Sequence, residues 1–273
     1  MGSNSDKIFN EDTEVIVLYP DKTENNEICF WYKERGNIKI DYKLFIDLLN
    51  QLGFRIYFLG RDYLFVHINN NIVEETEPVK IKDTVREYII NPSIEYTEEF
   101  TAEKILSKVI SQSPTLFSRG NLEYLDKLGD DFNRDTRHES FIYFRNCFVK
   151  VTADGYTIHK YNELPKLVWK KQIIDRDFYE VDSVSDFRTF IFRVCRDDAQ
   201  RYDSFRSVIG YLLHGYKDPA LAKAIIFMDE KIDDGSNGGC GKSLLGNAIS
   251  KVRKSAKRME TAFRVREYIP CFW

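Results

Sequence analysis

A glycine-rich segment late in the printed sequence constrains the fold more than any other feature. It reads GSNGGCGKS over residues 235–243, after the apolar run AKAIIFM (222–228) and before the helical run LLGNAISKVRK (244–254). A short β-branched run is typical of a strand buried in a parallel sheet. The pattern G-x-x-x-x-G-K-[ST] between a strand and a helix is that of a phosphate-binding loop, or P-loop. The order of strand, loop and helix therefore predicts the first unit of an α/β nucleotide-binding domain.

The residue types of this loop suit a triphosphate. Glycine lets the backbone turn so that successive N–H groups point at phosphate oxygens, and the following helix presents its positive dipole end to the same anion. Lys242 would reach the β- and γ-phosphates, and the Ser243 hydroxyl would ligate Mg²⁺. We therefore predict ATP and Mg²⁺ as cofactors of the full-length protein, with nucleotide contacts from Asn237, Gly238, Gly239, Cys240, Gly241, Lys242 and Ser243.

Two features depart from the pattern. Ser236 stands where the pattern has its first glycine, and Gly235 comes one residue earlier. The segment DEKIDDG (229–235) lengthens the connection from the strand and carries four carboxylates. These would repel a triphosphate unless they face water or hold a metal ion. A glycine-rich turn that contains GKS by chance stays open as the alternative.

Length and composition indicate a globular chain. With 273 residues, the chain is long enough for two domains of ordinary size. Hydrophobic residues make up 43% and charged residues 30%, which excludes a disordered chain. The net charge of -3 gives no overall attraction to nucleic acid, so a DNA site has to be a local basic patch.

Cysteine spacing and hydropathy bear on metal binding and location. The five cysteines are scattered and none has zinc-ligand spacing, which argues against a zinc site and indicates a reducing compartment. The longest apolar runs are far too short to span a bilayer. We expect a soluble, cytoplasmic protein with no membrane partner.

Hydrophobic periodicity predicts both helices and strands. Period-two runs between polar turns predict strands at 15–19, 28–33, 54–58 and 63–68, and a hairpin formed by 141–151 and 156–161 around the turn 153–155. Apolar residues at helical spacing predict helices at 40–53, 79–90, 99–112 and 121–129, and two helices within 184–216 that break at Asp197-Asp198.

These elements predict an α+β N-terminal region with a helical middle domain, followed by an incomplete P-loop (α/β) ATPase segment. We place a small α+β domain at 1–95, a helical domain with a hairpin at 96–218, and the start of the ATPase domain at 219–273. The order helix, hairpin, helix in the first domain fits a winged-helix module and equally fits many other small α+β domains.

Basic residues near aromatic ones are candidates for DNA binding, because such groups can follow a phosphate backbone and stack on bases. The alternative is a solvated helix face. The spacing of Asp175 and Asp177, with Asp182 nearby, could hold a metal ion but is common in turns. The basic candidates are Arg188, Arg193, Arg196, Arg201, Arg206, Lys251, Arg253 and Lys254, with Trp169, Lys170 and Lys171 as a further stacking candidate.

The order of GYLLHGYKDP (210–219), a short strand and NGGCGKSLL (237–245) resembles the superfamily 3 helicases of phage and plasmid primase-helicases. The segment 141–178 also resembles the region that these proteins place before the helicase core. The resemblance implies ATP-driven DNA unwinding coupled to primer synthesis, single-stranded DNA as partner, a hexameric homo-oligomer, and the cytoplasm of a bacterial host cell.

Activity of this chain is a separate question. A helicase of this type needs an apolar strand that ends in an acidic pair, and no such strand follows Ser243. We therefore expect the N-terminal part of a longer protein, cut inside its motor domain and inactive in ATP hydrolysis. A non-catalytic DNA-binding or scaffold module with a vestigial P-loop is the alternative. A small kinase is disfavoured, because its P-loop would lie near the start of the chain.

Overall fold

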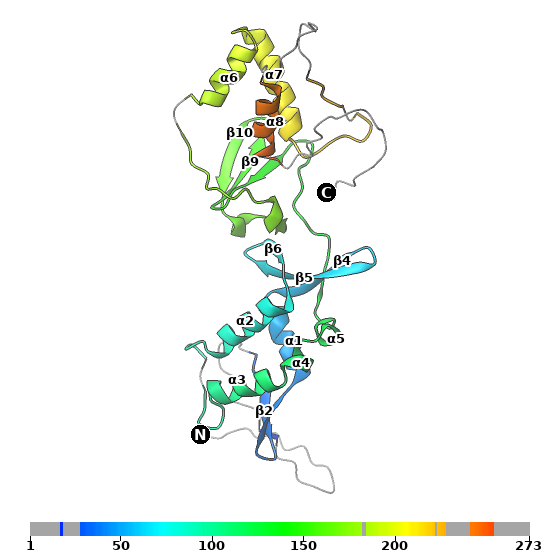
Figure 1. Ribbon diagram of the computed structural model, residues 1–273, viewed down its shortest axis with the longest axis vertical. Coiled ribbons are helices and arrows are strands. Elements are labelled where there is room, and N and C mark those ends of the chain that lie inside the picture. The colour runs from blue at the N-terminus through cyan, green and yellow to red at the C-terminus, as the bar shows by residue number, and fades with distance from the viewer. Residues whose placement is uncertain are drawn as a thin grey trace. The chain divides into compact units, whose positions relative to one another are not determined.

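The computed structural model describes the backbone of residues 17–18, and residues 28–94, 96–181, 184–221, 223–227 and 241–253 (Figure 1). These residues fall into two compact units. The N-terminal unit holds the described residues up to Asn133 together with Leu164–Lys170. The C-terminal unit holds Arg134–Glu163 and the described residues from Lys171 onward. The predicted domain boundaries at 95 and 218 each fall inside one of these units.

The N-terminal unit combines two small sheets with five helices among its described residues. One sheet has the order β1-β2-β3 and the other the order β11-β6-β5-β4-β7. The elements are β1 (Val17–Leu18), β2 (Trp31–Glu34), β3 (Asn37–Ile40), α1 (Tyr42–Gln51), β4 (Phe54–Leu59), β5 (Asp62–Asn69), β6 (Ile72–Glu75), α2 (Pro78–Ile89), α3 (Ala102–Ser111), α4 (Ser113–Leu116), α5 (Arg119–Leu122), β7 (Lys127–Leu128) and β11 (Val168–Trp169).

Local sequence signals explain helix α1 and its neighbouring hairpin. The Asp41 side chain caps α1 by accepting the N–H of Leu44 at 3.0 Å. Gly53 ends the short connection between α1 and β4 and has a φ of 88°. A Cβ at this position would lie 2.4 Å from the Ile68 carbonyl oxygen, so the close approach of β5 requires glycine. Asn70 and Asn71 make the turn between β5 and β6 in the left-handed region, which asparagine tolerates.

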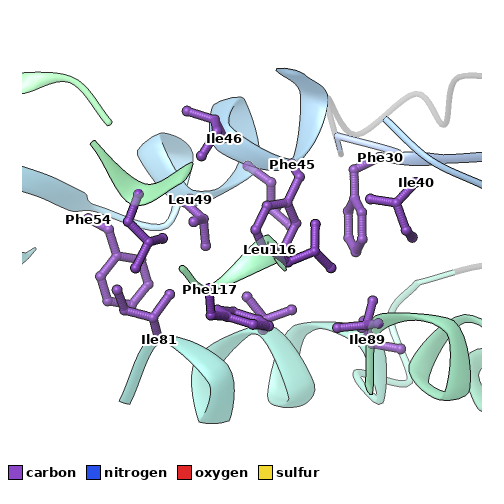
Figure 2. Packing of buried hydrophobic residues seen from close by; sticks show 14 of the residues in the cluster. Phe30, Ile40, Phe45, Ile46, Leu49, Phe54, Ile81, Ile89, Leu116 and Phe117 are labelled. Atoms are coloured by element: carbon purple, nitrogen blue, oxygen red, sulfur yellow. The ribbon is translucent and has the colours of Figure 1, made fainter. Parts of the chain in front are cut away.

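The core of this unit lies between the helices and the sheets (Figure 2). Aromatic and aliphatic side chains from segments far apart in the sequence meet there, and Phe30 packs edge-on against Phe45 at a centroid distance of 5.4 Å. Phe45 also meets Phe117 edge-on at 5.5 Å. The completely buried members include Phe30, Phe45, Leu48, Leu49, Phe54, Ile81, Ile89, Ile105, Leu116 and Leu122.

The C-terminal unit consists of a three-stranded antiparallel sheet and three helices in its described part. The sheet order is β10-β9-β8, and the register pairs Gly155 with Thr152 around the tight turn. The elements are β8 (Ser140–Tyr143), β9 (Phe148–Thr152), β10 (Gly155–His159), the 3₁₀ helix η1 (Tyr161–Glu163), α6 (Asp186–Val194), α7 (Ala199–Leu213) and α8 (Lys242–Ser250), while the 3₁₀ helix η2 (Lys170–Gln172) joins the two units along the chain.

The break between α6 and α7 has a clear cause. Arg196 and Asp197 adopt φ values of 57° and 56°, which ends α6, and the Asp198 side chain accepts the N–H of Arg201 at 2.8 Å, which begins α7. The predicted break at Asp197-Asp198 is therefore confirmed, as is the turn of the hairpin at 153–155. The predicted first arm of this hairpin, 141–151, is wrong as a single strand, because it forms β8 and β9, which pair with each other.

Several other predicted elements are confirmed, and two more are wrong. The α+β class is confirmed, and most predicted strands and helices of the N-terminal unit exist within a few residues of their predicted bounds. The predicted helix at 121–129 is wrong: α5 ends at Leu122, and β7 pairs in parallel with β4 through Lys127 and Leu128. Among the described residues, no helix is long and apolar enough to cross a membrane.

The predicted strand at 222–228 is also wrong. Its described part, 223–227, has no strand conformation. Ile226 is 77% exposed, whereas a buried parallel strand would cover it. Phe227 instead packs its ring against Phe205 of α7 at a centroid distance of 5.7 Å. The described residues therefore show no unit of strand, P-loop and helix.

Candidate functional site

Helix α8 begins directly after a glycine in the left-handed region. Gly241 has a φ of 79° and a ψ of 1°, and no side chain caps the helix. Its carbonyl accepts the N–H of Leu245 at 2.9 Å, so the helical hydrogen bonds begin at this residue. Lys242 and Ser243 form the start of the first turn, and both are exposed.

Only part of the predicted P-loop can be placed. Gly241, Lys242 and Ser243 lie in the described residues, at the start of α8. Asn237, Gly238, Gly239 and Cys240 lie outside them. The structure thus brings the last three predicted contact residues together at one helix end.

Packing against α6 also favours glycine at position 241. A Cβ at this position would lie 2.7 Å from Cζ of Phe190, far inside van der Waals contact. Phe190 itself packs beside a small buried cluster in which Leu245 and Ile249 of α8 meet Ile191 of α6. Because Leu245 and Ile249 are four residues apart, they form one stripe of the helix. Helix α8 is therefore held on α6 and α7 by one narrow apolar face.

The predicted DNA-binding arginines lie on the outside of α6 and α7. Arg188 and Arg193 on α6, and Arg201 and Arg206 on α7, are all exposed. Arg206 also lies 3.4 Å from Asp203 and 5.6 Å from the centroid of the Tyr202 ring. Arg196 occupies the bend between the helices. Lys251 is exposed after the end of α8, and Lys254 lies outside the described residues.

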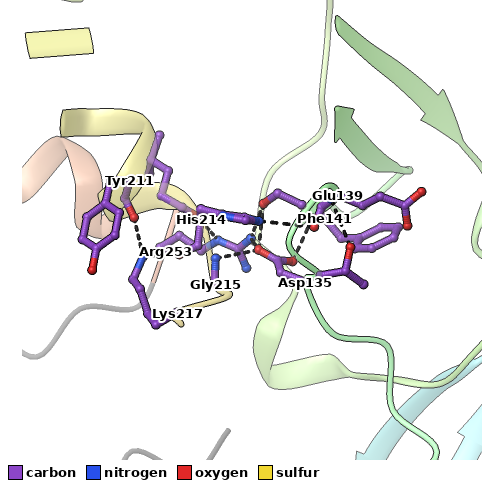
Figure 3. A network of polar contacts seen from close by, with 11 residues as sticks. Asp135, Glu139, Phe141, Tyr211, His214, Gly215, Lys217 and Arg253 are labelled. Carbon is purple, nitrogen blue, oxygen red and sulfur yellow. Dashed lines mark hydrogen bonds and ion pairs between the residues drawn. The ribbon is translucent and has the colours of Figure 1, made fainter. Parts of the chain in front are cut away.

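Arg253, the remaining basic candidate, is bound to the protein itself (Figure 3). One terminal nitrogen of its guanidinium donates to Asp135 at 2.6 Å and to the Ser140 hydroxyl at 3.0 Å. Its Nε donates to the Leu213 carbonyl, at the end of α7, at 2.7 Å. In the described structure this arginine therefore joins parts of the C-terminal unit, and its guanidinium is not presented outward like those of α6 and α7.

Asp135 is the centre of this polar network. Its side chain is 5% exposed and accepts the Ser140 hydroxyl at 2.7 Å and the Phe141 N–H at 2.9 Å. It also accepts the Gly215 N–H at 2.6 Å, in addition to Arg253. A carboxylate with several donors is well satisfied despite its burial.

Lys217 adds a second set of contacts at the end of α7. Its ammonium donates to the His214 carbonyl at 2.6 Å and to the Tyr211 carbonyl, and it lies 4.0 Å from the centroid of the Tyr211 ring. Burial lowers the pKa of Lys217, and the nearby charge of Arg253 lowers it further. A cation at a helix C-terminus satisfies carbonyls that lack helical partners. The residues 211–217 are thus held by the contacts of Lys217 with the Tyr211 and His214 carbonyls and by the hydrogen bond from Gly215 to Asp135.

Two of the three acidic candidates for a metal site lie beside Arg145. Arg145 donates to Asp177 at 2.8 Å, which lowers the pKa of that carboxyl, and lies 3.7 Å from Asp175. Asp182 lies outside the described residues. No group of three or more histidine, cysteine or acidic side chains is placed to hold a metal ion in the part of the chain that the structure describes.

Comparisons with protein-family models, with curated proteins and with solved structures found no match to this chain. The case for a function of this chain therefore rests on the residues of the candidate site. The candidate residues are those at the exposed start of α8 and the exposed arginines of α6 and α7. The Asp135 network, which sequence reasoning missed, lies at the other end of α8.

Proposed function

We propose that this chain binds the phosphates of ATP, with Mg²⁺, through residues 237–243, and that it is the N-terminal part of an ATP-dependent replicative helicase or primase-helicase of phage or plasmid type. One observation supports the proposal most. Lys242 and Ser243 are both exposed in the first turn of α8, directly after Gly241, where the N–H groups of a helix lack helical partners.

This geometry suits an anion. The start of a helix carries a partial positive charge and N–H groups that lack helical partners. Lys242 would add a full positive charge at the same place, and Ser243 would supply the hydroxyl that ligates Mg²⁺. Together they would give the phosphates charge-assisted hydrogen bonds.

The exposed arginines of α6 and α7 support a DNA partner, which we take to be single-stranded. Acidic residues, among them Asp186, Asp197, Asp198 and Asp203, alternate with these arginines. We therefore expect weak binding that depends on backbone contacts and on salt concentration. A homo-oligomer, a hexamer in the complete protein, is part of the same proposal.

Nucleotide binding is tested by titrating the chain with a fluorescent ATP analogue in the presence of Mg²⁺. We expect Lys242→Ala to weaken the affinity at least tenfold, and Ser243→Ala to weaken it only when Mg²⁺ is present. Lys160→Ala, which removes an exposed lysine of the same unit, is the control and should leave the affinity unchanged. Equal affinity in Lys242→Ala and the unsubstituted chain would refute the nucleotide site.

DNA binding is tested by fluorescence anisotropy of a single-stranded oligonucleotide at several salt concentrations. Each lost phosphate contact should reduce the slope of log affinity against log salt by about 0.7. We expect the double variant Arg188→Ala/Arg193→Ala to reduce the slope by about twice that amount. Arg145→Ala, which removes an exposed arginine paired with Asp177, should leave the slope unchanged. An affinity that does not depend on salt would exclude this interface.

A non-catalytic DNA-binding or scaffold module is the second candidate function. The observation that favours it is the lack of strand conformation at 223–227, because a P-loop normally follows a buried strand. Under this alternative the chain binds the oligonucleotide but not the ATP analogue. The two titrations together therefore distinguish the candidates.

A further inference from the structure

We propose that Arg253 and Asp135 are positioning residues for helix α8, so that a polar anchor at the end of this helix sets the orientation of Lys242 and Ser243 at its start. The inference rests on the proposed function for its ligand. Its geometry rests on the hydrogen bonds between Arg253, Asp135, Ser140 and Leu213 (Figure 3).

Apart from Gly241 beside Phe190, the apolar contacts of α8 come from one stripe and restrain its orientation weakly. Leu245 and Ile249 are its buried residues, and they contact α6 and α7 through one stripe. Apolar contact is non-directional, and a helix held by two side chains can rotate or slide at little cost. A rotation that keeps both side chains covered would still move the Lys242 side chain by several ångströms, by elementary helix geometry.

The hydrogen bonds of the Arg253 guanidinium restrain the orientation of α8. Arg253 follows the end of α8 by three residues, and its planar group donates from Nε and from one terminal nitrogen to different segments. The carbonyl of Leu213 belongs to α7, and the side chains of Asp135 and Ser140 precede and begin β8. A rigid fork with partners on two sides restricts rotation as well as translation.

Asp135 in turn fixes the partners of Arg253 relative to each other. It accepts the N–H groups of Phe141 and Gly215, which lie at the start of β8 and just after α7. A Cβ at position 215 would lie 2.9 Å from the Asp135 carboxylate oxygen, so this approach requires glycine. The end of α7, the start of β8 and the end of α8 thus meet at a single buried carboxylate.

The affinity for a phosphate should depend on this anchor. If α8 samples several orientations, only the fraction with the correct one binds, and the apparent dissociation constant rises in inverse proportion to that fraction. Removal of Arg253 would leave the Asp135 carboxylate buried with one partner fewer, which favours rearrangement of the whole network. Lysine cannot reproduce the fork and should restore only part of the effect.

The test uses the variants Arg253→Leu, Arg253→Lys and Gly215→Ala in the full chain. Arg145→Leu is the matched control, because it removes an arginine–aspartate pair whose arginine is exposed. Amide hydrogen exchange of peptides covering 242–253, measured without nucleotide, reports the anchoring of α8. Titration with Mg²⁺ and the fluorescent ATP analogue reports phosphate binding.

We expect faster exchange over 242–253 and about tenfold weaker ATP affinity in Arg253→Leu, with smaller effects in the same direction in Arg253→Lys and Gly215→Ala. The control should match the unsubstituted chain in both measurements. Exchange that is unchanged in the Arg253 variants would overturn the anchor. Faster exchange with unchanged affinity would overturn its role in positioning.

The experiment separates this inference from the proposed function. If the unsubstituted chain fails to bind the ATP analogue, the proposed function is wrong, and the exchange measurement still decides whether Arg253 anchors α8. If Arg253→Leu does not fold, the milder variants Arg253→Lys and Gly215→Ala decide the outcome by the same two measurements.

Discussion

Replacement of Gly241 by alanine is the sharpest test of how α8 begins. Alanine has to adopt the φ of 79° that Gly241 has, and the left-handed region costs a residue with a Cβ about 1–2 kcal/mol. The new Cβ would also lie 2.7 Å from the Phe190 ring. Because Phe190 is only half-buried, its ring can shift, so we take the low end of the cost of overpacking, about 1 kcal/mol.

The two costs add, and a smaller gain opposes them. Alanine reduces the conformational freedom of the unfolded chain relative to glycine, which returns about 0.5 kcal/mol. The net cost for Gly241→Ala is then about 2 kcal/mol. Since 1.4 kcal/mol is a factor of ten in an equilibrium constant, the docked population of α8 should fall about thirtyfold relative to the undocked one.

Hydrogen exchange of peptides covering 242–253 measures this ratio directly, and Gly246→Ala is the matched control. Gly246 lies inside α8, and a Cβ there would meet nothing within 4 Å. Its replacement should stabilise the helix by about 0.5–1 kcal/mol and slow the exchange a fewfold. The reasoning is refuted if the two alanine variants change the exchange in the same direction. In a third variant, Gly241→Ala/Phe190→Leu, the cost of the contact with the Phe190 ring should be removed, while the cost of the left-handed conformation should stay.

Two further predictions concern the N-terminal unit. Phe45 is completely buried among aromatic rings, so Phe45→Ala should lower the free energy of unfolding by about 3–5 kcal/mol in urea titrations, and a loss below about 1 kcal/mol would contradict the core described above. Hydrogen bonds from Lys170 and Lys80 lower the pKa of Glu74, so its ionised form is favoured by folding. The resulting stability is present above the unfolded-state pKa of Glu74 and is lost as the pH falls through its lowered folded-state pKa. Glu74→Gln should therefore flatten this part of the acid-unfolding profile. An unchanged profile would show that the contacts of Glu74 with Lys80 and Lys170 contribute nothing to stability.

The elements that the sequence predicts well are those with local signals. Helix α1 begins at a capping aspartate and ends just before Gly53, and both signals lie within a few residues of the helix. The break between α6 and α7 is of the same kind, because Asp198 caps the second helix. In each case the residues that decide the conformation are neighbours in the sequence.

The errors arise where distant partners decide. Residues 127–128 have a helical pattern, but β4 offers them a free edge, and the backbone pairs there instead. Residues 223–227 have a strand pattern, but among the described residues no strand pairs with them, and Phe227 packs on α7. Asp135 accepts hydrogen bonds from Gly215, which is 80 positions away in the sequence, and from Arg253, which is 118 positions away. The sequence around Asp135 therefore does not indicate that it is the centre of a network.

The residues of the Gly-Lys-Ser sequence differ in what the fold alone explains. Gly241 is favoured by its φ and by the nearby Phe190 ring, so its presence would be expected in a chain that binds no nucleotide. Leu245 and Ile249 are likewise explained by burial. Ser243 is different, because it is exposed in the first turn of α8 and neither burial nor backbone geometry calls for a serine there. Evidence for a phosphate site therefore has to come from Ser243 and Lys242, because loss of binding in a Gly241 variant would also follow from a misplaced helix.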